Sequence, residues 1–264
     1  MKKKLSPIDI IYSCLIFVFL YAPIAVLIIY SFNSSKSRGT WGGFSLKWYA
    51  ELFSNSDIMQ ALITTLTIAV ISAAVSVVIG TAAAVGIYYS KRRTRALLTS
   101  VSNIPMLNAD IVTGISLLLL FTFLKIDLGY ITILLAHITF NIPYVILSVM
   151  PKLRQLDKNA YEAAIDLGAT PLRAFFSVII PEISPGIVTG AILAFTMSID
   201  DFVISFFTTG GGVSTLSIEI YTMAKRGIKP EINALSAIMF LVVMTLLIIV
   251  NVRSSNAEKK RDMN

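Results

Sequence analysis

The stretch Glu162-Ala-Ala-Ile-Asp-Leu-Gly168, followed after nine residues by Val178-Ile-Ile-Pro181, lies in the one long polar segment of an otherwise apolar second half. That segment, 151–185, is too polar to cross a membrane. Strong helix formers fill Asn159–Leu167, and Gly168 stands where the left-handed residue that ends a helix is wanted. A short helix that ends at a glycine is therefore predicted.

A second helix is expected directly after this glycine. Thr170-Pro171 supplies a hydroxyl N-cap followed by a proline in the first turn, where its missing N–H costs nothing. The helix would run to about residue 180. Pro181 and Pro185 are expected to end it before the chain re-enters the membrane. The two helices would form an elbow.

One face of the first elbow helix is slim, because Ala163 and Ala164 carry small side chains. A slim face permits close approach of a groove on a partner protein, and Glu162 can pair with a basic residue there. The alternative is an ordinary cytoplasmic loop with helical content. It explains the pattern equally well on these grounds.

Composition indicates a membrane protein. Of the 264 residues, 56% are hydrophobic and only 14% charged, whereas a soluble domain carries about a quarter charged residues. The apolar residues come in blocks of about 20, the length that a helix needs to cross a bilayer. We expect an all-α integral membrane protein with one membrane domain over 1–264. Six spans are predicted, at about 8–30, 60–88, 97–123, 130–150, 186–207 and 231–252.

The formal charge of +7 indicates membrane topology rather than nucleic-acid binding. Most of the 22 lysines and arginines fall in alternate segments between the predicted spans. The positive-inside rule assigns such segments to the cytoplasm. Both termini and the elbow are therefore expected there, and no nucleic-acid partner is expected.

Three aspartates lie inside predicted spans, Asp110 in the third and Asp200 with Asp201 in the fifth. A carboxylate at this depth costs roughly 2.5–3.5 kcal/mol, so it usually faces a cavity or a partner. Along straight helices, Asp110 and Asp200 would both lie about 20 Å from the inner end. They either line a path for a cation with spaced amines, with Ser198 close by, or pair internally. The absence of lysine and arginine from these spans favours the path.

The two neighbouring aspartates point in different directions, because consecutive helical residues are about 100° apart. One of Asp200 and Asp201 is expected to face the path. The other would cap a neighbouring helix or lie near the interface.

Trp48, Glu219 and Tyr221 are candidates for the outer end of such a path. Aromatic rings attract amines by cation–π contact, and Glu219 can contact a cationic ligand or the protein that delivers it. An interfacial aromatic belt and a solvated loop charge are the plainer interpretations. His137 is expected to be a hydrogen-bonded structural residue. No cluster of His, Cys and carboxylates predicts a metal, and no cofactor is expected.

The run from Glu162 to Pro181 resembles the EAA motif of the permease subunits of binding-protein-dependent ABC importers, with Val178 and Ile180 as conservative departures. The resemblance implies a type I importer permease whose cytoplasmic coupling helix docks in a cleft of an ATPase subunit. The coupling residues that it implies are Glu162, Ala163, Ala164, Gly168 and Pro181. The chain has no Gly-x-x-x-x-Gly-Lys-[Ser/Thr] phosphate loop, so ATP hydrolysis is expected on a partner chain and not on this one.

Further stretches resemble the spermidine/putrescine permeases of that family over nearly the whole chain. They are Tyr30-Ser-Phe-Asn-Ser-Ser, Lys47-Trp-Tyr, Asp110-Ile-Val, His137-Ile-Thr-Phe, Ser198-Ile-Asp-Asp-Phe-Val and Pro230-Glu-Ile-Asn-Ala-Leu. The resemblance implies polyamine cargo and a bacterial cell-membrane location. It also implies a heterodimer with a sister permease subunit, two ATPase subunits and an external polyamine-binding protein.

Three other functions compete. The nearest is a type I permease for another small cationic or polar solute, since a path for anions would want basic groups or helix N-termini. Paired intramembrane aspartates also suggest an aspartyl protease, which would leave the elbow unexplained. An ion-coupled secondary transporter would take up its cargo without ATP.

Overall fold

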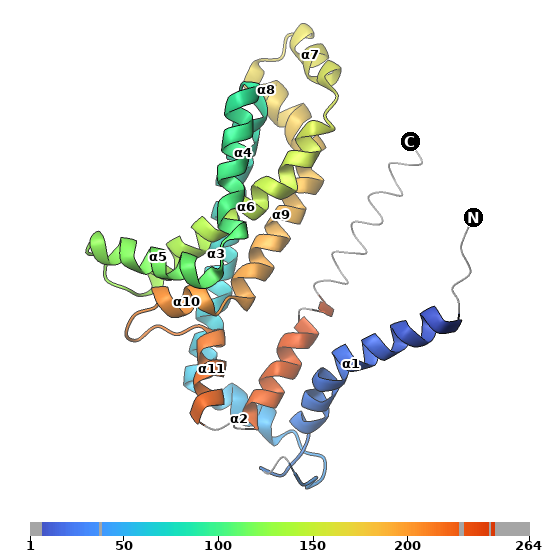
Figure 1. Ribbon diagram of the computed structural model, residues 1–264, viewed down its shortest axis with the longest axis vertical. Coiled ribbons are helices and arrows are strands. Elements are labelled where there is room, and N and C mark those ends of the chain that lie inside the picture. Colours follow the sequence, from blue (N-terminus) through green and yellow to red (C-terminus); the bar gives the residue numbers. More distant parts are fainter. Residues whose placement is uncertain (1–6, 37–38, 227–229, 243, 246–264) are drawn as a thin grey trace. The chain divides into compact units, whose positions relative to one another are not determined.

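A computed structural model describes residues 7–36, 39–226, 230–242 and 244–245 (Figure 1). Within them the regular elements are helices, and the β contact is an isolated antiparallel bridge between Asn33 and Phe44. The all-α prediction is confirmed. The described residues form two compact units, one up to Met59 and from Ile220 onward, the other Gln60–Glu219. The single membrane domain predicted for 1–264 concerns both units together and stays a prediction.

The first unit contains α1 (Pro7–Ser31), α2 (Lys47–Ser54) and a shorter apolar helix over Glu231–Val242. From residue 11 onward α1 is long and apolar enough to cross a membrane, which agrees with the first predicted span. The amphipathic α2 is anchored by Trp48, whose indole Nε1 donates to the carbonyl oxygen of Asn33 at 2.6 Å. This bond ties α2 to the segment that follows α1.

The second unit is built on three long helices, α3 (Ser56–Tyr89), α6 (Tyr130–Arg154) and α9 (Ile180–Asp200). Glycines bring the other two helices close to α6. A Cβ atom on Gly80 of α3 would lie 2.7 Å from the Cβ of Val145, and one on Gly190 of α9 would lie 3.2 Å from the Val145 Cα. A Cβ atom on Gly186 would lie 2.8 Å from the Ser148 carbonyl oxygen and 3.2 Å from the Val149 Cα. Small residues permit such backbone approach between helices in a membrane.

The third predicted span, 97–123, is wrong as a straight helix. It consists of α4 (Arg92–Leu107) and α5 (Asp110–Phe123), which are bent by 102°. Pro105 stays inside α4, and the break falls at the extended residues Asn108 and Ala109. The predicted distance of Asp110 from the inner end of the span is therefore also wrong, because it assumed one continuous helix.

The prediction that Pro181 ends the second elbow helix is also wrong. The helix α8 (Pro171–Ala174), the π-helix η1 (Phe175–Ile179) and α9 follow one another without interruption. In η1 the N–H of Ile180 bonds the carbonyl of Phe175, five residues back, which changes the hydrogen-bond register just before the proline. The Pro181 carbonyl, which Pro185 leaves without an N–H donor, accepts the Ser184 hydroxyl at 2.8 Å.

The fifth predicted span, 186–207, therefore has different ends. The continuous helix runs Pro171–Asp200, and after a break come α10 (Val203–Thr208) and α11 (Leu216–Arg226). In the described part, four helices are long and apolar enough to cross a membrane, and the bent α4–α5 pair is a fifth candidate. The sixth predicted span, 231–252, extends past the described residues. The number six stays a prediction.

The elbow matches its prediction closely. Helix α7 (Lys158–Asp166) ends at Gly168, whose φ is 88°. The N–H of Gly168 donates to the carbonyl of Ile165 at 2.8 Å, and the N–H of Ala169 donates to the carbonyl of Ala164 at 3.0 Å. This pair of bonds is a Schellman motif. The Thr170 hydroxyl then accepts the N–H of Arg173 and caps α8. Figure 1 shows the elbow at one end of the α6–α9 pair.

Candidate functional site

The break between α9 and α10 separates the two neighbouring aspartates. Asp200 is the last residue of α9, and its side chain is exposed. The Asp201 carboxylate instead accepts the N–H of Ile204 at 3.1 Å and of Ser205 at 2.7 Å, which caps the first turn of α10. The expectation that one aspartate caps a neighbouring helix is thus met by Asp201.

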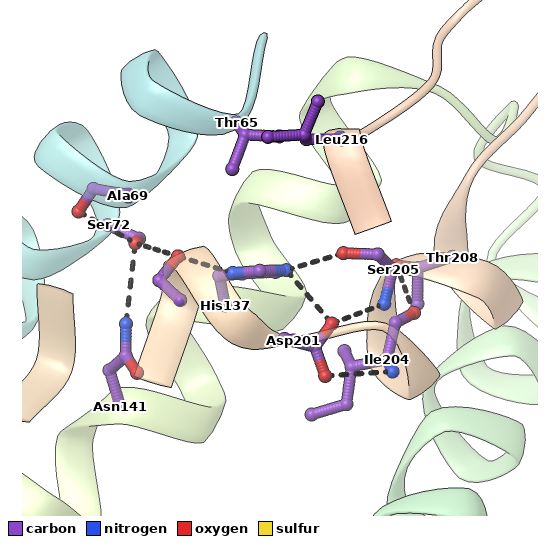
Figure 2. A network of polar contacts seen from close by, with 11 residues as sticks. Thr65, Ala69, Ser72, His137, Asn141, Asp201, Ile204, Ser205, Thr208 and Leu216 are labelled. Atoms are coloured by element: carbon purple, nitrogen blue, oxygen red, sulfur yellow. Dashed lines mark hydrogen bonds and ion pairs between the residues drawn. The ribbon is translucent and has the colours of Figure 1, made fainter. Parts of the chain in front are cut away.

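His137 of α6 lies against this break and is 2% exposed. Its Nε2 is 3.0 Å from the Ser205 hydroxyl and 3.5 Å from the Asp201 carboxylate, and its Nδ1 is 2.5 Å from the Ser198 hydroxyl (Figure 2). One imidazole therefore contacts α9, the break and α10. The prediction that His137 is a hydrogen-bonded structural residue is confirmed.

The hydrogen bonds continue from α9 to α3. The Ser198 hydroxyl is 3.2 Å from the Ser72 hydroxyl, and the Asn141 amide donates to Ser72 at 3.3 Å. The six residues of this buried polar network are Ser72, His137, Asn141, Ser198, Asp201 and Ser205. Ser198, predicted near a path, is 2% exposed and lies inside the network.

One proton arrangement fits the side-chain contacts when the Ser72 hydroxyl points to Ser198 rather than to the Ala69 carbonyl, its other acceptor at 3.3 Å. The Asn141 Oδ1 is buried and has no hydrogen-bond partner among the described residues. Asn141 donates to Ser72, Ser72 to Ser198, and Ser198 to the Nδ1 of His137. The Nε2–H of His137 then points to Ser205 and to the Asp201 carboxylate. The donors run in one direction and end on the Asp201 carboxylate, which in its ionised form acts only as an acceptor.

Asp110 stands at the other break, as the first residue of α5, and its side chain is exposed. The N-cap residue Ala109 has no side-chain oxygen, so the carboxylate supplies negative charge where the helix dipole favours it. Helix α5 packs on α10, because a Cβ atom on Gly114 would lie 2.9 Å from the Phe207 ring. Asp110 and Asp200 thus both mark helix breaks in one packed region of the second unit.

The aromatic candidates have partners within the chain. Trp48 is 2% exposed, and the Lys47 ammonium lies 5.2 Å from its ring centroid. Tyr221 is exposed, with the Lys225 ammonium 4.9 Å from its ring centroid. Glu219 is half-buried in the first turn of α11. The burial of Trp48 leaves its ring little surface for a ligand.

The elbow residues lie on an exposed surface. Glu162, Ala163, Gly168 and Pro181 are exposed, and Ala164 is half-buried. The elbow connects α6 to the continuous α8–α9 helix, and α6 and α9 pack against each other.

Two network residues were missed by sequence reasoning, Ser72 and Ser205. Both are 0% exposed hydroxyls in apolar helices. Isolated serines in predicted spans are a weak signal, because a serine can also bond its own helix backbone, as Ser116 does.

Comparisons with known proteins add a family. Residues 76–260 match the binding-protein-dependent transport system inner membrane component. The chain is 41% identical to the putrescine transport system permease protein PotI of Escherichia coli K12, over 97% of this chain and 94% of that protein. It is 40% identical to the spermidine/putrescine transport system permease protein PotC of the same strain, over 88% of each.

The fold also has a counterpart among solved structures. A bacterial ABC transporter involved in the import of the acidic polysaccharide alginate contains a chain that is similar with a TM-score of 0.69. The match covers 96% of this chain and 99% of that one at 15% identity.

Proposed function

Since the chain belongs to the family of binding-protein-dependent transport system inner membrane components, we propose that it is the permease subunit of an ABC importer for the polyamines putrescine and spermidine. The observation that carries the proposal is the likeness to two polyamine permeases, at 41% and 40% identity over most of the chain. The likeness to the alginate transporter supports the fold alone, because that cargo is acidic. Whether a permease of this fold accepts a positively or a negatively charged cargo must then depend on the charged residues along its own path.

Asp110 and Asp200 supply that charge in the proposed path. Irregular backbone at membrane depth is tolerated only where protein covers it or where it lines a water-filled cavity. Both carboxylates are exposed at a helix break, which we place at membrane depth in this proposal. A hydrated carboxylate attracts an ammonium group, and a polyamine carries several ammonium groups along one chain. Two separate acids therefore suit this cargo.

The remaining candidates have different proposed roles. Glu219 and Tyr221 are assigned to the outer end of the path, where they contact cargo or the binding protein. Trp48 is assigned to the structure of the first unit, and Ser198 and Asp201 to the structure of the α9–α10 break, because each is hydrogen-bonded within the chain.

The complex that we propose has this chain paired with a sister permease subunit, two ATPase subunits inside, and a polyamine-binding protein outside. Both termini and the elbow face the cytoplasm. The ATPases hydrolyse ATP, and this subunit catalyses no reaction. Closure of the ATPase pair displaces the elbow, tilts α6 and α9 together and opens the path outward. Nucleotide shifts this equilibrium only because its affinity differs between the two states.

Uptake of radiolabelled putrescine and spermidine tests the path. In cells that lack the chain, restored Asp110→Asn or Asp200→Asn should take up polyamine about tenfold more slowly than the restored parent, because a charged hydrogen bond is lost. Asp127→Asn, an exposed aspartate in the α5–α6 connection, is the matched control and should not change uptake. Normal uptake in both path variants would refute the path. Uptake of a different small cation, with none of polyamine, would favour the alternative cargo.

Coupling at the elbow is tested by ATP hydrolysis and uptake in the same preparation. Glu162→Lys should lower uptake while ATP hydrolysis continues, and Asp127→Lys, the same charge reversal elsewhere, should not. Gly168→Val should act like Glu162→Lys, whereas Gly168→Asn should be milder because asparagine tolerates the left-handed backbone. Coupling that survives both Glu162→Lys and Gly168→Val would contradict the docking role.

A further inference from the structure

We propose that His137 and Asp201 are positioning residues: their buried contact fixes the angle of the α9–α10 break and so the direction in which Asp200 presents its carboxylate. The functional part of this inference rests on the proposed role of Asp200 in the cargo path. The geometric part does not.

The break needs an external support because α10 is too short to hold itself. Isolated helices below about 12 residues are marginal even in favourable sequences, and α10 has 6. Asp201 satisfies two of its first N–H groups, at 3.1 and 2.7 Å. A cap alone leaves the direction of α10 free to vary about the extended backbone of Asp201, whose φ is −66° and ψ is 125°.

The imidazole of His137 supplies the missing constraint. Its ring is rigid and planar, and its two nitrogens point to opposite edges. Nδ1 contacts Ser198 on α9, whereas Nε2 contacts Ser205 on α10 and the Asp201 carboxylate between them. Figure 2 shows the ring with one nitrogen directed at Ser205 and Asp201. A rigid body bonded on both sides of a break sets the angle between the two helices.

Burial of the hydrogen-bonded groups favours this arrangement over one in which any of these bonds is broken. His137, Ser198 and Ser205 are each 2% exposed or less, so water does not replace a lost partner. A buried polar group without a hydrogen bond costs about 1–3 kcal/mol. A second hydrogen bond, from the Thr132 hydroxyl of α6 to the Thr208 carbonyl at 2.8 Å, fixes the far end of α10 to the same helix. Asp200 directly precedes the capping residue Asp201, so the direction of its side chain follows the angle of the break.

The rate of thiol labelling at position 200 measures how accessible the side chain there is, which depends on the angle of the break. Cys14 is the one cysteine of the chain, so Cys14→Ser removes the background. In the complete transporter, Asp200→Cys is labelled with a small trimethylammonium methanethiosulfonate reagent, with His137 intact or changed to Gln or Asn. Gln reaches only the Nε2 partners and Asn only the Nδ1 partner, so neither spans the break. Both should change the labelling rate at position 200 about fivefold, as expected for loss of about one hydrogen bond.

Asp127→Cys is the control position, because it is also an exposed aspartate of the second unit. Its labelling rate should stay constant in both His137 variants. An unchanged labelling rate at position 200 would overturn the positioning role. Equal changes at positions 200 and 127 would also overturn it, because they would mean that the His137 substitution loosens the whole second unit.

The labelling result is independent of transport. If Asp200→Asn leaves uptake normal while the labelling rate at position 200 shifts, the cargo role of Asp200 fails and the positioning of the break stands. If the cargo role of Asp200 and the positioning role of His137 are both correct, His137→Gln should raise the polyamine concentration for half-maximal uptake severalfold. The same change should add no further effect in an Asp200→Asn chain, because His137 acts through that carboxylate.

Discussion

The second unit departs from regular helix at Gly168 and again at Asp201, and the two places are stabilised by different means. In each, a helix ends and a side-chain oxygen caps the next helix, Thr170 for α8 and Asp201 for α10. At the elbow the bonds that close the turn join residues a few positions apart, on an exposed surface. At Asp201 the cap is 7% exposed and contacts His137, which comes from a different helix.

The difference indicates which of the two turns can change its backbone conformation at low cost and which cannot. An exposed, locally closed turn can bend toward a partner, because water replaces any bond that opens. A buried cap held by another helix has no such substitute. The elbow is therefore suited to receiving a force, and the break at Asp201 to keeping its geometry while the helices around it move.

Removal of the buried cap is expected to have the largest effect. Asp201→Ala leaves two N–H groups of α10 without their acceptor and removes the carboxylate beside the His137 ring, which should lower the free energy of unfolding by about 3 kcal/mol. The thermal unfolding midpoint of the purified complex in detergent measures it. Asp200→Ala, one residue earlier and exposed, is the control and should leave the midpoint within error. Equal midpoints for the two variants would mean that the buried cap adds no stability to the break.

A glycine just after the C-terminal end of α10 should have the second largest effect. A Cβ atom on Gly210 would lie 1.8 Å from the carbonyl oxygen of Leu128, so Gly210→Ala forces the loop after α10 away from the loop before α6. We expect a loss of about 2 kcal/mol, as for other overpacked sites. Gly211→Ala is the matched control, because nothing lies within 4 Å of its added methyl group. If both alanines unfold at the same temperature, the close approach does not support the break.

Removal of the exposed cap should have the smallest effect. Thr170→Ala loses one hydrogen bond of 3.4 Å at the start of α8, which should cost about 0.5–1 kcal/mol. Thr170→Ser keeps the hydroxyl and should restore the midpoint. A cost as large as that of Asp201→Ala would mean that the elbow is held as firmly as the buried break.

Much of the elbow was predictable from its own residues. Helix formers, Gly168 and the Thr-Pro pair act within one or two turns, and each was found where expected. The resemblance to ABC importer permeases that these residues indicated is confirmed by the family match over 76–260. The proline rule failed at Pro181 and Pro185, because a π turn and the Ser184 hydroxyl supply what the prolines lack.

The candidate site was predictable only in part. The angle between neighbouring helical residues predicted that Asp200 and Asp201 would take different roles. Which residue takes which role depends on where α9 ends and on His137, which is far from the two aspartates in the sequence. Likewise, an aromatic residue in a polar segment gave no sign that the fold would bury Trp48.

The amino-acid sequence by itself determined that this is a helical membrane protein with a glycine elbow, because hydrophobicity, caps and left-handed glycines act over a few neighbouring residues. Only the tertiary structure decided that the third span is bent at Asn108, that α9 stops at Asp200 and that His137 spans the break. Those outcomes depend on which side chains from distant parts of the chain satisfy a polar group once water has been removed.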